Sequence, residues 1–411
     1  MTASTQQSAT APLAKSQLVF IFLTILIDKI GSSIIIPILP FLVGQFRDDA
    51  LTLGFLTASF SVAQFLAIPV IGALSDRHGR RPVLLVCILG TTVAYSLFGI
   101  AGSLWVIYLS RLIDGITGGI PSTAQAYIAD VSSPENRAKN FGITGAAFGL
   151  GFTIGPALGG FLAKFSLELP IFIAAALALL NFLWGYFSLP ESLPVEKRQT
   201  TLEIKDFNPV SQLWRMFNKA QLRGLLLSFF LFNFVFTGFS SIYVLFLSER
   251  FGWGPTEAAL VFVWIGVLST LVQGGLIRKL LPRYGEAKLA LTGIVLIALA
   301  FGLTLGIPKQ GVGLYVGVYL TQAMLAFGVG FILPSLRALI SNRVSDKEQG
   351  RTIAGTQSLR SVASIAGPIW AGVVFDHLGI LSPFWMGGVM MVVALGITVV
   401  GLRQEGTQPC Q

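Results

Sequence analysis

Two charged side chains, Asp28 and Lys29, stand next to each other in an apolar run of about residues 18–42. A charge at the centre of a membrane-spanning helix costs about 2.5 to 3.5 kcal/mol on insertion scales, so such residues are usually paired, cavity-facing or functional. Adjacent helical residues diverge by about 100°. Asp28 and Lys29 are therefore not expected to pair ideally, and at least one should face a central cavity.

A carboxylate in a poorly solvated cavity holds a proton more readily than one in water. We expect Asp28 to bind and release a proton, with a structural ion pair to another helix or contact with a cationic ligand as alternatives. Lys29 could tune Asp28 or bind an anion.

Arg111 and Asp114 are three residues apart in a later apolar run, so they can share a helix face and neutralise each other. Their roles are open between proton coupling and a structural ion pair. Arg360, in another run, is expected to face inward or to extend to the membrane edge.

Neutral polar and aromatic side chains in the apolar runs could contact an amphipathic ligand. Asparagine and glutamine side chains can equally hold helices together, and aromatic stripes also face lipid. The candidate ligand contacts are Asp28, Lys29, Gln64, Asn233, Phe236 and Gln273, and Phe236 belongs to a stripe with Phe232, Phe239 and Tyr243.

The elements that position these residues are predicted to be membrane-spanning helices. The chain has 411 residues, of which 54% are hydrophobic and 11% charged, against roughly 25% charged in soluble domains. We predict an all-α integral membrane protein with 12 transmembrane helices in two six-helix bundles. The spans are expected at 18–42, 51–73, 82–101, 104–128, 140–163, 170–189, 224–247, 257–277, 287–307, 312–336, 352–374 and 382–402.

The predicted domains are an N-terminal tail (1–17), a first bundle (18–189), a central loop (190–223), a second bundle (224–402) and a C-terminal tail (403–411). If the N-terminus is cytoplasmic, only Arg47, Lys164, Arg250 and Lys309 fall in outer loops. Basic residues are retained on the cytoplasmic face, so both termini should be cytoplasmic. The net charge of +9 then reflects topology, and no nucleic-acid partner is expected.

The two halves resemble each other. The segment "YLSRLIDGITGGIP" from Tyr108 parallels "YLTQAMLAFGVGFILP" from Tyr319, so Arg111 and Asp114 correspond to Gln322 and Leu325. An internal duplication is predicted, in which the first copy alone carries the charged pair.

The loop "GALSDRHGRRP" after the second predicted span has glycine, aspartate and arginine at fixed spacing. It resembles the signature of the major facilitator superfamily, which implies a role in gating between helix bundles. A basic cytoplasmic turn is the alternative, and it would explain the arginines but not the glycine and aspartate spacing. Gly72 is expected to allow close helix approach and Gly79 a tight turn. The expected gating residues are Gly72, Asp76, Arg77, Gly79, Arg80 and Arg81, with Asp130 and Arg137 of "ADVSSPENR" as capping partners or as part of a solvated turn.

The fifth predicted span contains "GLGFTIGPALGG". Glycines four residues apart allow helices to pack closely, and the string resembles the antiporter signature of the same superfamily, found mainly in drug exporters. The expected packing residues are Gly151, Gly155, Pro156, Gly159 and Gly160.

Taken together, "IDKIGSSIIIPILP", "RLIDGITGG", "YIADVSS" and the glycine string look like the tetracycline exporter branch of the drug:proton antiporters. That branch uses an aspartate and a glutamine at the positions of Asp28 and Gln64. It has ionisable groups where this chain has Ala94, Ser269 and about Leu296. The resemblance implies export of a small amphipathic compound, as in multidrug or tetracycline-like efflux, while the three differences argue against magnesium–tetracycline itself.

No phosphate-binding loop occurs, which favours gradient-driven transport over nucleotide hydrolysis. His78 and His377 have no metal-ligand pattern around them, so we expect no metal, no cofactor and no enzyme activity. The expected partners are a small-molecule substrate, protons and the lipid bilayer, with the protein as a monomer. The expected location is the inner or plasma membrane, with a chloroplast membrane as the other option. The alternatives are a proton-coupled importer, a uniporter, or a non-transporting receptor or scaffold.

Overall fold

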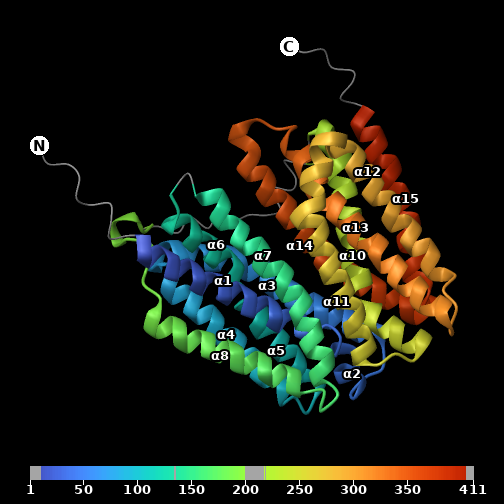
Figure 1. Ribbon diagram of the computed structural model, residues 1–411, viewed down its shortest axis with the longest axis horizontal. Coiled ribbons are helices and arrows are strands. Elements are labelled where there is room, and N and C mark those ends of the chain that lie inside the picture. Colours follow the sequence, from blue (N-terminus) through green and yellow to red (C-terminus); the bar gives the residue numbers. More distant parts are fainter. Residues whose placement is uncertain (1–10, 134–135, 200–216, 218, 404–411) are drawn as a thin grey trace, which may run out of the picture. The chain divides into compact units, whose positions relative to one another are not determined.

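A computed structural model describes residues 11–133, 136–199, 217 and 219–403, which form helices and turns without a strand (Figure 1). The earlier helices are α1 (Ala11–Ile34), α2 (Leu39–Gly44), α3 (Ala50–His78), α4 (Arg80–Gly99), α5 (Leu104–Ile116), α6 (Ile120–Val131), α7 (Arg137–Leu162), α8 (Leu169–Ser188) and the short η1 (Val195–Lys197). The later ones are α10 (Ala220–Phe251), α11 (Pro255–Leu271), η3 (Val272–Leu276), α12 (Ile277–Leu305), α13 (Val312–Ser341), α14 (Asp346–Leu378) and α15 (Ser382–Arg403).

Ten stretches of the described chain are long and apolar enough to cross a membrane. The all-α membrane class is therefore confirmed, while the exact count of twelve stays a prediction. The predicted span 104–128 is divided into α5 and α6 by a turn at Thr117–Gly119. The predicted spans 257–277 and 287–307 form one helical stretch that bends at Gly285, where φ is 76°. The positive φ at Gly285 is open to glycine because it lacks Cβ.

Contacts divide the chain into two compact units: residues 1–38 with 63–203, and residues 39–62 with 204–411. The first unit has a core of buried aliphatic side chains that includes Ile21, Ile25, Leu84 and Ile128, from α1, α4 and α6. The boundaries expected from the sequence stay a prediction, and most of the central loop and both tails lie outside the described residues.

The second unit has an aromatic core. The rings of Phe246 and Phe384 are 4.3 Å apart and those of Phe239 and Phe301 are 5.5 Å apart, between centroids. Phe239 and Tyr243 are 7% and 1% exposed. Most of the stripe on α10 therefore packs against α12 and α15 and faces neither lipid nor ligand, because large aromatic surfaces gain most by burial.

The N-terminal part of α3 belongs to the second unit because α14 holds it there. The carboxylate of Asp376 accepts the backbone N–H groups of Ala50 (2.9 Å) and Leu51 (2.8 Å). The first N–H groups of a helix have no partner within that helix, so the Asp376 side chain caps the start of α3. A Cβ at Gly54 would meet the backbone oxygen of Pro368, so the two helix backbones are in contact there.

Another tie in the second unit joins the residue before α10 to the first turn of α14. Lys219 Nζ donates to Glu348 Oε1 at 2.7 Å, and Ser345 Oγ donates to the other oxygen at 3.2 Å. The hydrogen bond from Lys219 and its positive charge lower the pKa of Glu348.

Candidate functional site

A cluster of four charges lies inside the first unit. Lys29 Nζ is 2.9 Å from Asp28 Oδ2, and the two side chains are only 23% and 13% exposed. The two neighbours were not expected to pair ideally, and they form a close ion pair because the flexible lysine chain bends back to the aspartate. The pair does not have hydrogen-bond geometry: Asp28 Oδ2 is buried and accepts no hydrogen bond from a described residue.

The second pair is the predicted one on the fourth span. Arg111 is 3.3 Å from Asp114 on α5, and both residues are buried. The guanidinium lies 5.0 Å from the ring centre of Phe98 and 5.9 Å from that of Tyr95, and the hydroxyl of Thr91 hydrogen-bonds to Asp114. Aromatic faces and a hydroxyl thus compensate charges that water does not reach.

Tyr95 lies at the meeting point of the two pairs. It is 2% exposed, and its hydroxyl interacts electrostatically with Asp114, Asp28 and Arg111. Its ring packs against Gly31, where a Cβ would be 2.6 Å from the ring. Asp114 also interacts electrostatically with Asp28 and Lys29. The four charges therefore form one coupled group, and a proton added to one changes the energy of the others.

A cavity of about 10 Å³ adjoins this group, with Asp28 and Tyr95 in its wall. Thr24, Thr91 and Asn181 give it polar sides, and Thr24 is 3.2 Å from the Asn181 amide oxygen. A polar space of this size holds about one water molecule. Such a molecule would lie beside both Asp28 and the Thr91 hydroxyl that contacts Asp114.

Gln64 belongs to the same unit. Its amide donates to the Gly118 carbonyl at 3.3 Å, at the turn between α5 and α6. This contact satisfies a backbone group that the break in the fourth span leaves without a helical partner.

The glycines of α7 lie against the part of α1 that carries the charges. A Cβ at Gly151 would meet Lys29 Cβ, and a Cβ at Gly155 or Gly159 would overlap Ser33 or Ile34. Ser33 Oγ donates to the Gly151 carbonyl at 2.9 Å, while Pro156 and Gly160 are buried on the same helix. The glycine face thus positions Asp28 and Lys29.

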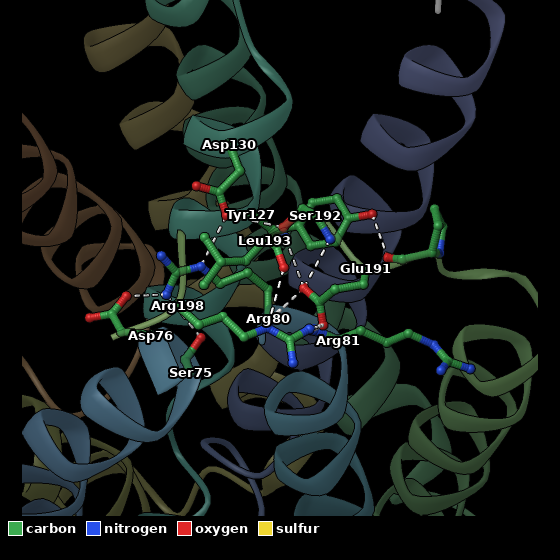
Figure 2. A network of polar contacts seen from close by, with 11 residues as sticks. Ser75, Asp76, Arg80, Arg81, Tyr127, Asp130, Glu191, Ser192, Leu193 and Arg198 are labelled. Atoms are coloured by element: carbon green, nitrogen blue, oxygen red, sulfur yellow. Dashed lines mark hydrogen bonds and ion pairs between the residues drawn. The ribbon is translucent and has the colours of Figure 1, made fainter. Parts of the chain in front are cut away.

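The signature loop forms a second polar network in the first unit, shown in Figure 2. Arg80 donates to Asp76 and, at 3.0 Å, to Asp130. Ser192 also donates to Asp130, at 3.1 Å. The structure therefore brings together three of the predicted gating residues.

Glu191, which sequence reasoning missed, completes this network. Its carboxylate accepts the backbone N–H groups of Arg80 (2.8 Å) and Arg81 (3.2 Å), so it caps the start of α4 (Figure 2). Gly79 has φ 104° and ψ 161°, a backbone conformation open almost only to glycine. A Cβ there would also overlap the Glu191 carboxylate. The sequence feature that could have pointed to Glu191 is an acidic residue just after the sixth predicted span, 170–189.

Other predicted residues are placed differently. A Cβ at Gly72 would meet no described residue within 4 Å, so the close approach expected there stays a prediction. Arg77 is exposed, and the side chain of Arg137 lies outside the described part of the structure.

The candidates of the second unit are dispersed. Asn233 is buried and bonds to its own helix at Phe229, Phe236 is partly buried beside Phe232, and Gln273 is exposed on η3. Gln322 and Leu325, the counterparts of the charged pair, are both buried.

The fold and the buried charges define a multi-pass membrane carrier, and comparisons identify the class. The sequence model of the Major Facilitator Superfamily matches residues 21–307 and 279–409. The chain belongs to this family, which consists of transporters and not enzymes. It is 34% identical to the class C tetracycline resistance protein of Escherichia coli over 88% of this chain and 90% of that protein.

Two further relatives show how widely such chains differ. Multidrug resistance protein 2 of Bacillus subtilis is 28% identical over 94% of this chain and 95% of its own. The crystal structure of the human organic anion transporter MFSD10 (TETRAN) has a TM-score of 0.69 and 27% identity, covering 94% of this chain and 99% of that one.

Proposed function

We propose that this chain is a proton-coupled antiporter that exports a small amphipathic compound across the cell membrane by alternating access. The observation that carries the proposal is the buried Asp28 oxygen that accepts no hydrogen bond from a described residue, within a coupled group of two acids and two bases. A proton on Asp28 would leave Lys29 with an unpaired charge, and an unpaired buried charge is costly. Protonation of Asp28 would therefore favour a different conformation in which Lys29 is hydrated or paired, and this preference couples proton binding to the change of conformation.

Export is favoured over import by the glycine face of α7, by the resemblance to exporters, and by the names of the resistance-protein relatives. In this proposal Asp28, Arg111 and Asp114 carry the coupling, and Lys29 tunes Asp28. Gln64, Asn233, Phe236 and Gln273 remain candidates for substrate contact, and the Arg80 network acts at a cytoplasmic gate.

The test follows proton release from everted membrane vesicles while lipophilic cations, anions and tetracyclines are added. We expect at least one compound to drive proton release and to accumulate in vesicles with the unaltered protein. Asp28→Asn should abolish both, because the amide cannot exchange a proton. Glu196→Gln, at an exposed position on η1, is the matched control and should behave as the unaltered protein.

Other results would exclude the proposal. Accumulation without proton release in both proteins would indicate a uniporter. Movement of compound out of the everted vesicles together with protons would indicate an importer. No movement of any compound would favour a receptor or scaffold.

A further inference from the structure

Two arginines lie in the membrane-spanning helices of the second unit without an acidic partner among the described residues. Arg337 on α13 and Arg360 on α14 form no ion pair with a described residue, whereas Arg111 is paired with Asp114. The two guanidinium charges repel each other. Both residues are exposed, so an anion can reach them. An anion between two like charges would offset their repulsion.

The end of the unit where α13 passes into α14 contains a pocket of about 420 Å³ beside these arginines. Arg337 and Ser341 line it from α13, and Thr352, Thr356 and Gln357 line it from α14. Arg360 lies three and four residues beyond Gln357 and Thr356, hence on the same helix face. Hydroxyl, amide and guanidinium donors therefore share one region.

The rest of the lining is apolar, with Ala338, Ile340 and Ile353 in the wall. The volume falls in the range of small-molecule sites, about 300 to 1,000 Å³. Arginine offers a planar pair of donors that matches carboxylate and phosphate oxygens. An apolar body with one anionic group thus fits both parts of the lining.

We propose that this pocket, with Arg337 and Arg360, binds the anionic group of an amphipathic organic anion. The inference rests on the proposed function, because it names the chemical class of the exported compound. Arg360 lies eight residues after Thr352, which is about 12 Å along the helix axis at 1.5 Å per residue. A bound anion would therefore be held within the membrane-spanning part of α14 and not in the loop before it.

Equilibrium binding to the full-length protein in phosphatidylcholine nanodiscs tests the site without any transport measurement. The probes are 1-naphthoate and 1-naphthyl phosphate, with 1-naphthamide and 1-naphthol as neutral counterparts. We expect at least one anion to bind more tightly than its counterpart. Arg337→Gln and Arg360→Gln should each weaken its binding about tenfold or more, the factor for losing one hydrogen bond to a charged group.

Two further variants separate the site from general effects. Arg360→Lys keeps the charge but loses the paired donors, so its affinity should lie between those of the unaltered protein and Arg360→Gln. Arg278→Gln, at an exposed position of α12, should leave binding unchanged. Size-exclusion profiles show whether each variant is folded.

An anionic lipid headgroup offers the same chemistry as a soluble anion. In discs that also contain phosphatidylglycerol, competition with the probe, lost in Arg360→Gln, would identify the headgroup as an occupant of this site. Equal affinity for anion and neutral counterpart, or anion binding that survives both arginine substitutions, would overturn the proposal. So would the absence of both probe binding and Arg360-dependent lipid retention. Asp28→Asn should bind the anion even if it transports nothing, so the two proposals can fail separately.

Discussion

At the scale of single residues, Glu191 shows how one carboxylate can order a loop. It accepts two backbone N–H groups at the start of α4 and lies 3.9 Å from Arg198. Helix starts leave such donors without partners, and the adjoining Gly79 leaves space for the carboxylate.

Removal of this cap should destabilise the first unit. Glu191→Ala is expected to cost about 1 kcal/mol, the usual value for a lost helix cap. The measurement is the melting temperature of purified protein in detergent. Glu191→Gln keeps an acceptor and should lose less. Glu196→Ala removes an exposed carboxylate five residues later and should change nothing; an equal loss in that variant would disprove the capping role.

The residue scale also marks where sequence reasoning failed. The side chains of Asp28, Arg111 and Asp114 could be singled out because charge in apolar sequence is costly. The contact between Asp28 and Lys29 could not, because a lysine rotamer depends on what surrounds it. Glu191 was missed because its partners are backbone groups, which have no sequence signature.

At the scale of elements, α7 and α1 approach so closely that glycine is required. The backbone oxygen of Ile30 and the hydroxyl of Ser33 occupy the space where a side chain at Gly155 would begin. The Lys29 side chain is fixed in the same contact, with its ammonium 4.8 Å from the ring centre of Phe148.

Gly155→Ala should therefore force the two helices apart. We expect a loss of about 1 to 3 kcal/mol, the range for overpacking, together with reduced transport because Asp28 and Lys29 shift. Gly145→Ala, on the same helix, is the matched control, because a Cβ at Gly145 would meet no described residue within 4 Å. Thermal melting and vesicle transport measure the two effects; identical behaviour of both variants would rule out this account.

Helix positions were predictable because long apolar runs have few alternatives, whereas the breaks within them were not. The bend at Gly285 depends on a positive φ that glycine allows but does not demand. The turn at Thr117–Gly119 uses negative φ angles that most residues can adopt, so no residue type marks it. The burial of the aromatic stripe depends on α12 and α15, which are distant in sequence.

At the scale of the whole molecule, the predicted orientation can be tested with the protein's own thiols. The chain has two cysteines, and Cys87 is 2% exposed. A membrane-impermeant maleimide should therefore react only with Cys410 in the C-terminal tail. We expect labelling in everted vesicles and none in intact cells, because the distribution of basic residues among the loops predicts a cytoplasmic tail.

Cys410→Ser should abolish the labelling, which shows that the reacting thiol is the intended one. Labelling of intact cells that disappears in Cys410→Ser would place the C-terminus outside and reverse the predicted topology.

The two halves, which the sequence predicts to be a duplication, hold different polar groups. The first unit has Arg111 and Asp114, whereas Gln322 and Leu325 fill the corresponding sequence positions in the second. The second unit instead carries Arg337 and Arg360, which have no ion pair with a described residue. No residue of either group belongs to the other unit. Substitutions without shared partners combine almost additively. If the first group couples protons and the second binds the ligand, as proposed, drift in the second half can change specificity while selection preserves the coupling in the first.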